Sequence, residues 1–168
     1  MIKKLNHQRK RRLSAVFFTI AVILWMAVIF WFSAQPADIS TDMSESVGRR
    51  LGSLIIPDFS DWEPEEQLAF ADRIDFAVRK CAHATEYAIL AGLLLGMFAS
   101  RGLKGKKLNA AVMGMVLFYA STDELHQLFV PGRACMITDV LIDCAGGAVM
   151  CMFYFLICCP MKRRLDKL

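Results

Sequence analysis

Four long apolar runs alternate with charged segments along the chain. They cover about residues 13–33, 79–99, 108–128 and 136–159. Each run is about 20 residues long, which is enough for a helix to cross about 30 Å of hydrocarbon. The pattern therefore predicts an all-α fold, a bundle of four transmembrane helices that forms a single domain over residues 1–168.

The connection between the first two runs, residues 40–78, has a different pattern. Its apolar residues recur every four positions on either side of a break at residues 57–64, which begins and ends with proline. This spacing predicts two short amphipathic helices on the outer membrane surface, and the second could continue into the next run. Residues 40–41 are expected to cap the first helix, and Ser60 with Glu63 has the spacing of a capping box. An acidic solvated loop is the alternative. The recurring apolar residues are Val47, Leu51, Ile55, Phe70, Ile74 and Val78.

Lysine and arginine gather in three clusters, within residues 3–12, 101–107 and 162–167. With four spans, all three clusters fall on the same side of the membrane. The positive-inside tendency assigns that side to the cytoplasm, so both termini are expected there in a multi-pass cell-membrane protein. The net charge of +4 is explained by topology and lipid contact, and nucleic acid is not an expected partner.

The hydrophobic content of 56% also exceeds that of an ordinary soluble domain. The six cysteines lie at or within the predicted helices and include no CxxC pair, which favours small apolar membrane residues. Cys81 and Cys135 fall near the predicted outer surface, and a bridge between them stays an open question.

Polar and charged residues gather at the predicted outer ends of three of the apolar runs. In the second run, Arg79, His83, Glu86 and Tyr87 share one helix face at one-turn spacing. Asp72, Arg73 and Asp75, just before that run, are expected on the helix surface. The residues expected to form a site are Arg79, Lys80, His83, Glu86, Tyr87, Asp123, Glu124, Gln127, Arg133, Asp139 and Asp143.

These groups need partners, because a charged residue at the centre of a span costs about 2.5–3.5 kcal/mol. We therefore expect a polar pocket in the outer half of the bundle, with Arg79 or Arg133 facing Glu86 and the other acids. The acids outnumber the bases, so either some carboxyls are protonated or the pocket holds a cation. The alternative is that the polar contacts only fix helix register.

The ordered combination of four motifs resembles the VanZ-like family of small bacterial membrane proteins, over about residues 13–154. The name-giving member is associated with low-level resistance to the glycopeptide teicoplanin, so the resemblance implies a membrane protein with a link to glycopeptide susceptibility. It also implies that the polar residues above are characteristic of the family, Arg79 excepted. The motifs are FSAQP at 32–36, RKCAHATEY at 79–87, STDELHQLFVPGR at 121–133, and TDVLID at 138–143 followed by Gly146 and Gly147.

The first functional hypothesis is a protein that binds or modulates a lipid-linked cell-envelope component at the outer leaflet. Arg79, Lys80 and Arg133 would contact phosphate, while Tyr87 and Gln127 would hydrogen-bond the head group. The expected partners are membrane lipids or a lipid-linked envelope precursor.

The second hypothesis is an intramembrane enzyme acting on such a lipid, with His83 or Glu86 as general base or acid. The chain has no Ser-His-Asp order and no HExxH motif. A metal site would need an unusual ligand set, so no metal or cofactor is predicted. That set would be His83, Glu86, Asp123, Glu124 and His126.

The third hypothesis is a small transporter or channel. The inner halves of the runs, residues 89–98, 108–117 and 150–159, are apolar. A continuous polar path would then require oligomerisation, which ranks this function last.

Overall fold

A computed structural model describes residues 2–165, with side chains described for residue 6 and residues 8–157. Within that part of the chain every regular element is helical, which confirms the all-α prediction. The elements are α1 (Ile2–Ser33), α2 (Ala37–Ile55), the short 3₁₀ helix η1 (Phe59–Asp61), α3 (Pro64–Ser100), α4 (Gly105–Gln127) and α5 (Ile137–Leu165).

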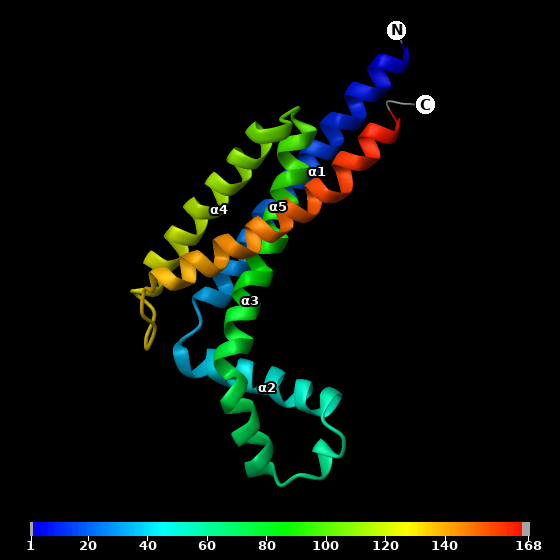
Figure 1. Cartoon of the computed structure of the whole chain (residues 1–168). Helices are drawn as coiled ribbons and strands as arrows, with labels where there is room; N and C mark the ends of the chain where they lie inside the picture. The colour runs from blue at the N-terminus through cyan, green and yellow to red at the C-terminus, as the bar shows by residue number, and fades with distance from the viewer. Residues whose placement is uncertain (1, 166–168) are drawn as a thin grey trace.

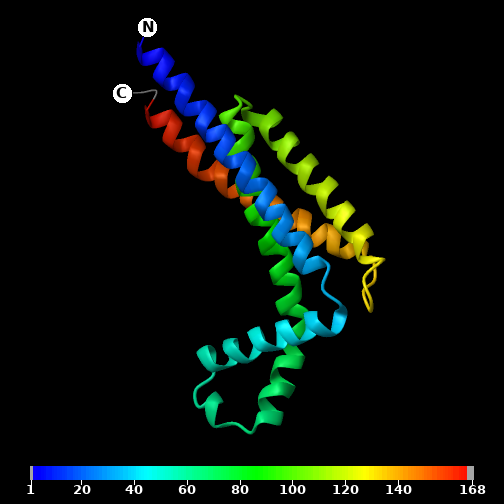
Figure 2. The same cartoon turned by 180° about the vertical axis from the view of Figure 1, so that it is seen from behind.

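The four long helices α1, α3, α4 and α5 form an elongated bundle, with α3 in contact with all the other α-helices. The N-terminal end of α1, the turn between α3 and α4, and the C-terminal end of α5 lie together at one end of the bundle (Figure 1). Figure 2 shows the same arrangement from behind. The three segments that carry the basic clusters therefore share one end, as the charge pattern predicts.

At the opposite end, α2 crosses α3 and, with η1 and the first turns of α3, forms an arm (Figure 1). Three residues on one side of α2, namely Ser44, Gly48 and Gly52, are buried. A Cβ on Gly48 would lie 3.1 Å from the Cα of Ala71, so the absence of a side chain lets the two helix backbones approach. The apolar residues of α2 instead stay exposed, including Val47 and Ile55.

The expected helix caps are wrong. The first arm helix begins at Ala37, and its N-cap residue is Pro36, four residues before the expected cap at Ser40. Proline fixes φ and has no N–H, so it suits the start of a helix. The capping box at Ser60 and Glu63 does not form either: Ser60 lies in η1, and α3 starts at Pro64 without a side-chain cap hydrogen bond.

The second amphipathic segment and the second apolar run form one helix, since α3 continues without interruption for 37 residues. Its length is about 55 Å at 1.5 Å per residue, well beyond the thickness of a hydrocarbon core. The first helix is also longer than expected, because the basic segment before residue 13 continues α1.

Three helical segments in the described chain are long and apolar enough to cross a membrane: Gln8–Ser33, Pro64–Ser100 and Ile137–Ile157. Their outward faces carry exposed apolar side chains such as Phe17 and Phe153, as contact with lipid requires. The helix α4, expected as the third of four spans, is not among them. The lysines at its start and the carboxyls at its end lower its hydropathy.

Glycines let the long helices pack closely. A Cβ on Gly146 of α5 would overlap the carbonyl oxygen of Ala84 in α3, and one on Gly96 of α3 would overlap the ring of Phe18 in α1. Such contacts are typical of membrane bundles, where small residues let backbones approach. The core that they enclose is apolar toward the end that carries the basic segments, and it includes Leu90, Leu94, Leu95, Leu108, Val112 and Val116.

Candidate functional site

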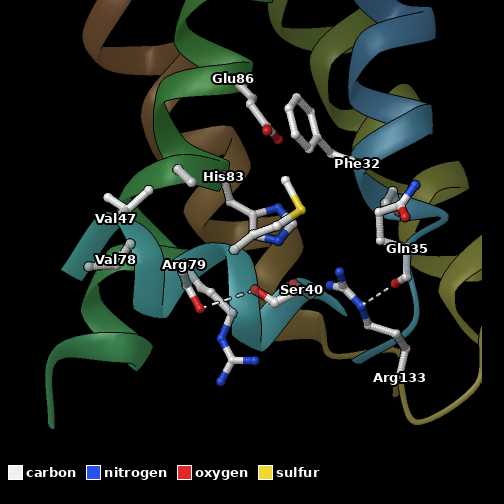
Figure 3. A pocket seen from close by; sticks show the side chains of 13 residues that line it. Phe32, Gln35, Ser40, Val47, Val78, Arg79, His83, Glu86 and Arg133 are labelled. Atoms are coloured by element: carbon white, nitrogen blue, oxygen red, sulfur yellow. Dashed lines mark hydrogen bonds between the residues drawn. The ribbon is translucent and has the colours of Figure 1, made fainter. Parts of the chain in front are cut away.

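A cavity of about 210 Å³ lies where the end of α1, the first half of α2, the middle of α3 and the loop between α4 and α5 meet. Figure 3 shows the ring of His83 in the middle of this cavity, with Glu86 and Phe32 on one side and Arg79 and Arg133 on the other. The lining residues are Phe32, Ser33, Gln35, Ser40, Met43, Ser44, Val47, Val78, Arg79, Ala82, His83, Glu86 and Arg133.

The spacing on α3 explains why three of the predicted residues share the cavity. Arg79, His83 and Glu86 stand at one-turn intervals, so one face of α3 presents all three. Tyr87, expected on the same face, is fully buried instead, and its ring lies 6.1 Å from that of Tyr119. Each four-residue step turns the position by about 40°, so Tyr87 lies about 80° around the helix from Arg79 and enters the helix interface.

Arg79 is held on the arm side of the cavity by an ion pair with Asp75, one turn earlier on α3. Asp75 also accepts a hydrogen bond from Ser44 of α2, and Thr41 lies 3.4 Å from the Arg79 guanidinium. The expectation that Asp75 lies on the helix surface is therefore wrong. The Asp75–Arg79 spacing of four residues was the signal that could have revealed this pair.

Arg133 lies in the loop between α4 and α5 and donates from Nε to the carbonyl oxygen of Gln35, at 3.2 Å. Burial lowers the pKa of Arg133, the positive charge of Arg79 lowers it further, and Asp123 and Glu124 oppose the shift. Arginine nevertheless stays protonated at physiological pH. Arg133 therefore brings a full positive charge to the cavity wall.

The loop that carries Arg133 is fixed to the turn between α1 and α2. The backbone N–H of Ala37 donates to the carbonyl oxygen of Pro131 at 3.1 Å. Gly132 has a positive φ of 73°, which favours glycine, and its Cα faces Ala37 so closely that a Cβ would lie 2.9 Å from the Ala37 Cβ. This packing places the guanidinium of Arg133 beside the end of α1.

The predicted pairing of an arginine with Glu86 is not present. Among the described side chains, ion pairs join Arg79 to Asp75 and Lys80 to Asp139, the His83 ring lies 3.6 Å from Asp143, and no basic side chain pairs with Glu86. The Lys80–Asp139 pair links α3 to α5 with a distance of 2.5 Å. Lys80 thus faces α5, away from the cavity.

The remaining predicted residues form a buried polar cluster behind the cavity, in the interface of α1, α3, α4 and α5. Gln127 donates to the hydroxyl of Ser33 at 3.0 Å, and the backbone N–H of Met136 donates to Glu124 at 2.8 Å. The buried cluster consists of Tyr87, Asp123, Glu124, Gln127, Asp139 and Asp143.

Several polar atoms in the buried cluster have no hydrogen-bond partner within the described chain. They include both carboxylate oxygens of Asp123 and of Asp143, and the Tyr87 hydroxyl. An unsatisfied buried polar group costs about 1–3 kcal/mol, more if charged. Each such group therefore needs an explanation, such as a catalytic role, an ordered water or a bound ion.

The alternative metal site is not assembled. Within the described residues, no group of three His, Cys, Asp or Glu side chains is close enough to hold a metal ion. His126, one member of the ligand set considered, stacks on Phe30 of α1 with ring centroids 4.4 Å apart. Cys81 and Cys135 are exposed free cysteines, so no bridge joins them.

These features define an all-helical multi-pass membrane protein with a charged cavity and a buried polar cluster near one end of its bundle. The sequence profile of the VanZ/LLP1 family matches the chain over residues 18–158, so the protein belongs to this family, as its motifs predict. No curated protein and no solved structure matched the chain.

Proposed function

We propose that this VanZ/LLP1 protein crosses the cell membrane four times, with both termini in the cytoplasm and the arm outside. The start of α1 and the end of α5 lie at the same end of the bundle, which supports an even number of crossings (Figure 1). The helix α4 supplies the fourth crossing, and its exposed Leu117 and Phe118 suit contact with lipid. The basic segments at the shared end orient it toward the cytoplasm.

In this placement α2 lies along the outer membrane surface. It crosses α3, which runs along the bundle axis (Figure 2). Its exposed apolar residues, among them Met43, Val47 and Leu54, would enter the lipid boundary, while the exposed Arg49 and Arg50 would stay in the head-group region.

The cavity beside α2 would bind a lipid-linked cell-envelope component, and one observation carries this proposal: its wall combines apolar side chains with guanidinium groups. Phe32, Met43 and Val47 line the cavity together with Arg79 and Arg133. A ligand that satisfies both kinds of wall is an amphiphile with an anionic head group.

Arg133 is the group best placed to bind the anion. Asp75 already neutralises Arg79. Arg133 donates a hydrogen bond from Nε to the carbonyl oxygen of Gln35. Its two terminal nitrogens make no hydrogen bond to any described residue. A guanidinium offers two parallel donors to a phosphate, in a geometry that lysine cannot copy.

Native mass spectrometry with lipid identification tests this proposal on the detergent-purified protein and its Arg133→Ala variant. Charge-assisted hydrogen bonds contribute about 1.5–3 kcal/mol, so the variant should retain about 10–100-fold less of a specific lipid. Arg73→Ala is the matched control, because Arg73 is an exposed arginine on the arm and does not line the cavity. Equal lipid content in all three proteins would refute a head-group role for Arg133.

We also propose that occupancy of the cavity changes susceptibility to teicoplanin, because the family resemblance links such proteins to that antibiotic. Cells in which the Arg133→Ala variant replaces the unaltered protein should then show the same teicoplanin susceptibility as cells without the protein. Cells with the Arg73→Ala variant should match those with the unaltered protein.

Transport is the least supported function. Beyond the cavity, the described core contains Leu90, Leu94, Val112 and Val116, all fully buried. These side chains fill the bundle toward the basic end, and a polar path past them would need the bundle to open.

A further inference from the structure

Asp143 is a buried carboxylate that faces the histidine in the cavity. The Nδ1 atom of His83 lies 3.6 Å from Oδ1 of Asp143. The Asp143 side chain has no exposed surface, and its two oxygens make no hydrogen bond to any described residue. The His83 side chain is 15% exposed and lines the cavity. The imidazole thus stands between the cavity and a buried carboxylate.

The backbones of α3 and α5 fix this arrangement. Gly146, three residues after Asp143, lies directly against the backbone of Ala84, the residue next to His83. Both side chains start one turn or less from this contact, so the contact fixes how far apart their backbones lie. A slight approach would turn the 3.6 Å separation into a hydrogen bond.

Two carboxylates near His83 have no ion pair with a described lysine or arginine, Glu86 in the cavity wall and Asp143 behind the ring, and Asp143 is the one that lies 3.6 Å from Nδ1 of His83. Asp139, Lys80, Arg133 and Arg79 all lie close enough to interact electrostatically with the ring. Lys80 and Asp139 neutralise each other at 2.5 Å, and Arg79 is paired with Asp75 on α3. Arg133 faces the ring from the α4–α5 loop and remains available for an anion.

We infer that His83 and Asp143 form an acid–base pair that hydrolyses the terminal phosphate of a lipid diphosphate bound in the cavity. This inference rests on the proposed lipid-binding function and names its substrate class. His83 is the catalytic base, and Asp143 is a positioning residue that holds the imidazole with Nε2 toward the cavity and stabilises its protonated form. Arg133 binds the phosphate and offsets the charge that develops in the transition state.

The reaction balances with water as the only co-reactant. The oxygen of a water molecule forms a bond to the terminal phosphorus while Nε2 of His83 takes its proton. The bond between that phosphorus and the bridging oxygen breaks, and its electron pair stays on the lipid monophosphate. This leaving group is already a stable anion, so it needs no proton donor. Inorganic phosphate leaves, and His83 then releases its proton to solvent.

Phosphate release by the full-length protein in detergent tests this inference, with farnesyl diphosphate as the probe. The His83→Gln and Asp143→Asn variants should each lower kcat by about 100-fold or more, the range of acid–base catalysis. KM should stay within about twofold, because neither residue is the anion-binding group. A residue with a merely structural role would change KM and kcat together or unfold the protein. Asp42→Asn, the same change at an exposed position of α2, is the control and should leave kcat unchanged.

Binding of the same probe, measured in parallel, separates this inference from the proposed function. Binding without phosphate release, or release that survives both substitutions, would overturn the acid–base pair and leave the lipid-binding function standing. If the unaltered protein does not bind the probe at all, both the acid–base pair and the lipid-binding function are overturned. If Asp143→Asn fails to fold, His83→Gln decides the question, because its side chain faces the cavity.

Discussion

Replacing Gly146 by alanine tests whether the close contact between α3 and α5 builds the site. A Cβ at this position would overlap the carbonyl oxygen of Ala84 and lie 2.8 Å from its carbonyl carbon. These are backbone atoms, so no side-chain rotation relieves the clash. The two helices would have to separate near His83 and Asp143, which flank the contact.

The expected loss of stability follows from two opposing effects. Overpacking of a close contact costs about 1–3 kcal/mol, whereas a glycine-to-alanine change in a helix gains up to about 1 kcal/mol from helix propensity. We therefore expect Gly146→Ala to lower the free energy of unfolding by about 1–2 kcal/mol. Gly114 of α4 is the matched control: a Cβ there meets no atom within 4 Å, so Gly114→Ala should raise stability by up to about 1 kcal/mol.

Unfolding by denaturing detergent, followed by far-ultraviolet circular dichroism, measures both variants under the same conditions. The reasoning is refuted if Gly146→Ala is as stable as Gly114→Ala, because the close approach of α3 and α5 would then have no energetic consequence. A second readout is lipid-phosphate hydrolysis, which should fall in Gly146→Ala and not in Gly114→Ala.

Two further predictions concern the arm and the topology. Asp75→Asn removes the ion pair with Arg79 and should weaken the packing of α2 on α3 by about 1–2 kcal/mol. Trypsin should then cleave the arm faster than in the exposed control Asp42→Asn. Equal cleavage rates would argue against the Asp75–Arg79 pair as an anchor of the arm. In intact cells, a membrane-impermeant maleimide should label a protein whose only cysteine is Cys135, whereas a Lys104→Cys version should react only after permeabilisation. The reverse result would invert the proposed orientation.

The helical runs and the convergence of polar groups could be predicted from sequence because both depend on simple spacing. Apolar runs of about 20 residues define helices of membrane length, and the one-turn spacing of Arg79, His83 and Glu86 places them on one face. The cavity accordingly contains all three. The separation of Tyr87 and Lys80 from them depends on which neighbouring helix each one meets, and spacing along one helix carries no such information.

The packing of the arm could not be predicted from the sequence, for a related reason. Periodicity draws attention to large apolar residues such as Val47 and Leu51, yet these stay exposed. The buried side of α2 carries Ser44, Gly48 and Gly52, whose role is to bring backbones together. In a chain that contacts lipid, hydrophobicity marks the outer surface as often as the core, so it does not reveal which face packs against protein.

The unbroken length of α3 has a mechanical consequence. About 25 Å of this 37-residue helix would extend past a 30 Å hydrocarbon core. Its only proline is at the first position, so it has no built-in joint between the lipid-embedded part and the arm. If the bilayer becomes thinner and the span tilts by about 10°, the far tip swings sideways by about 4 Å. Such a tilt would move the whole arm as one rigid lever, and the cavity wall lies close to the point about which it would turn.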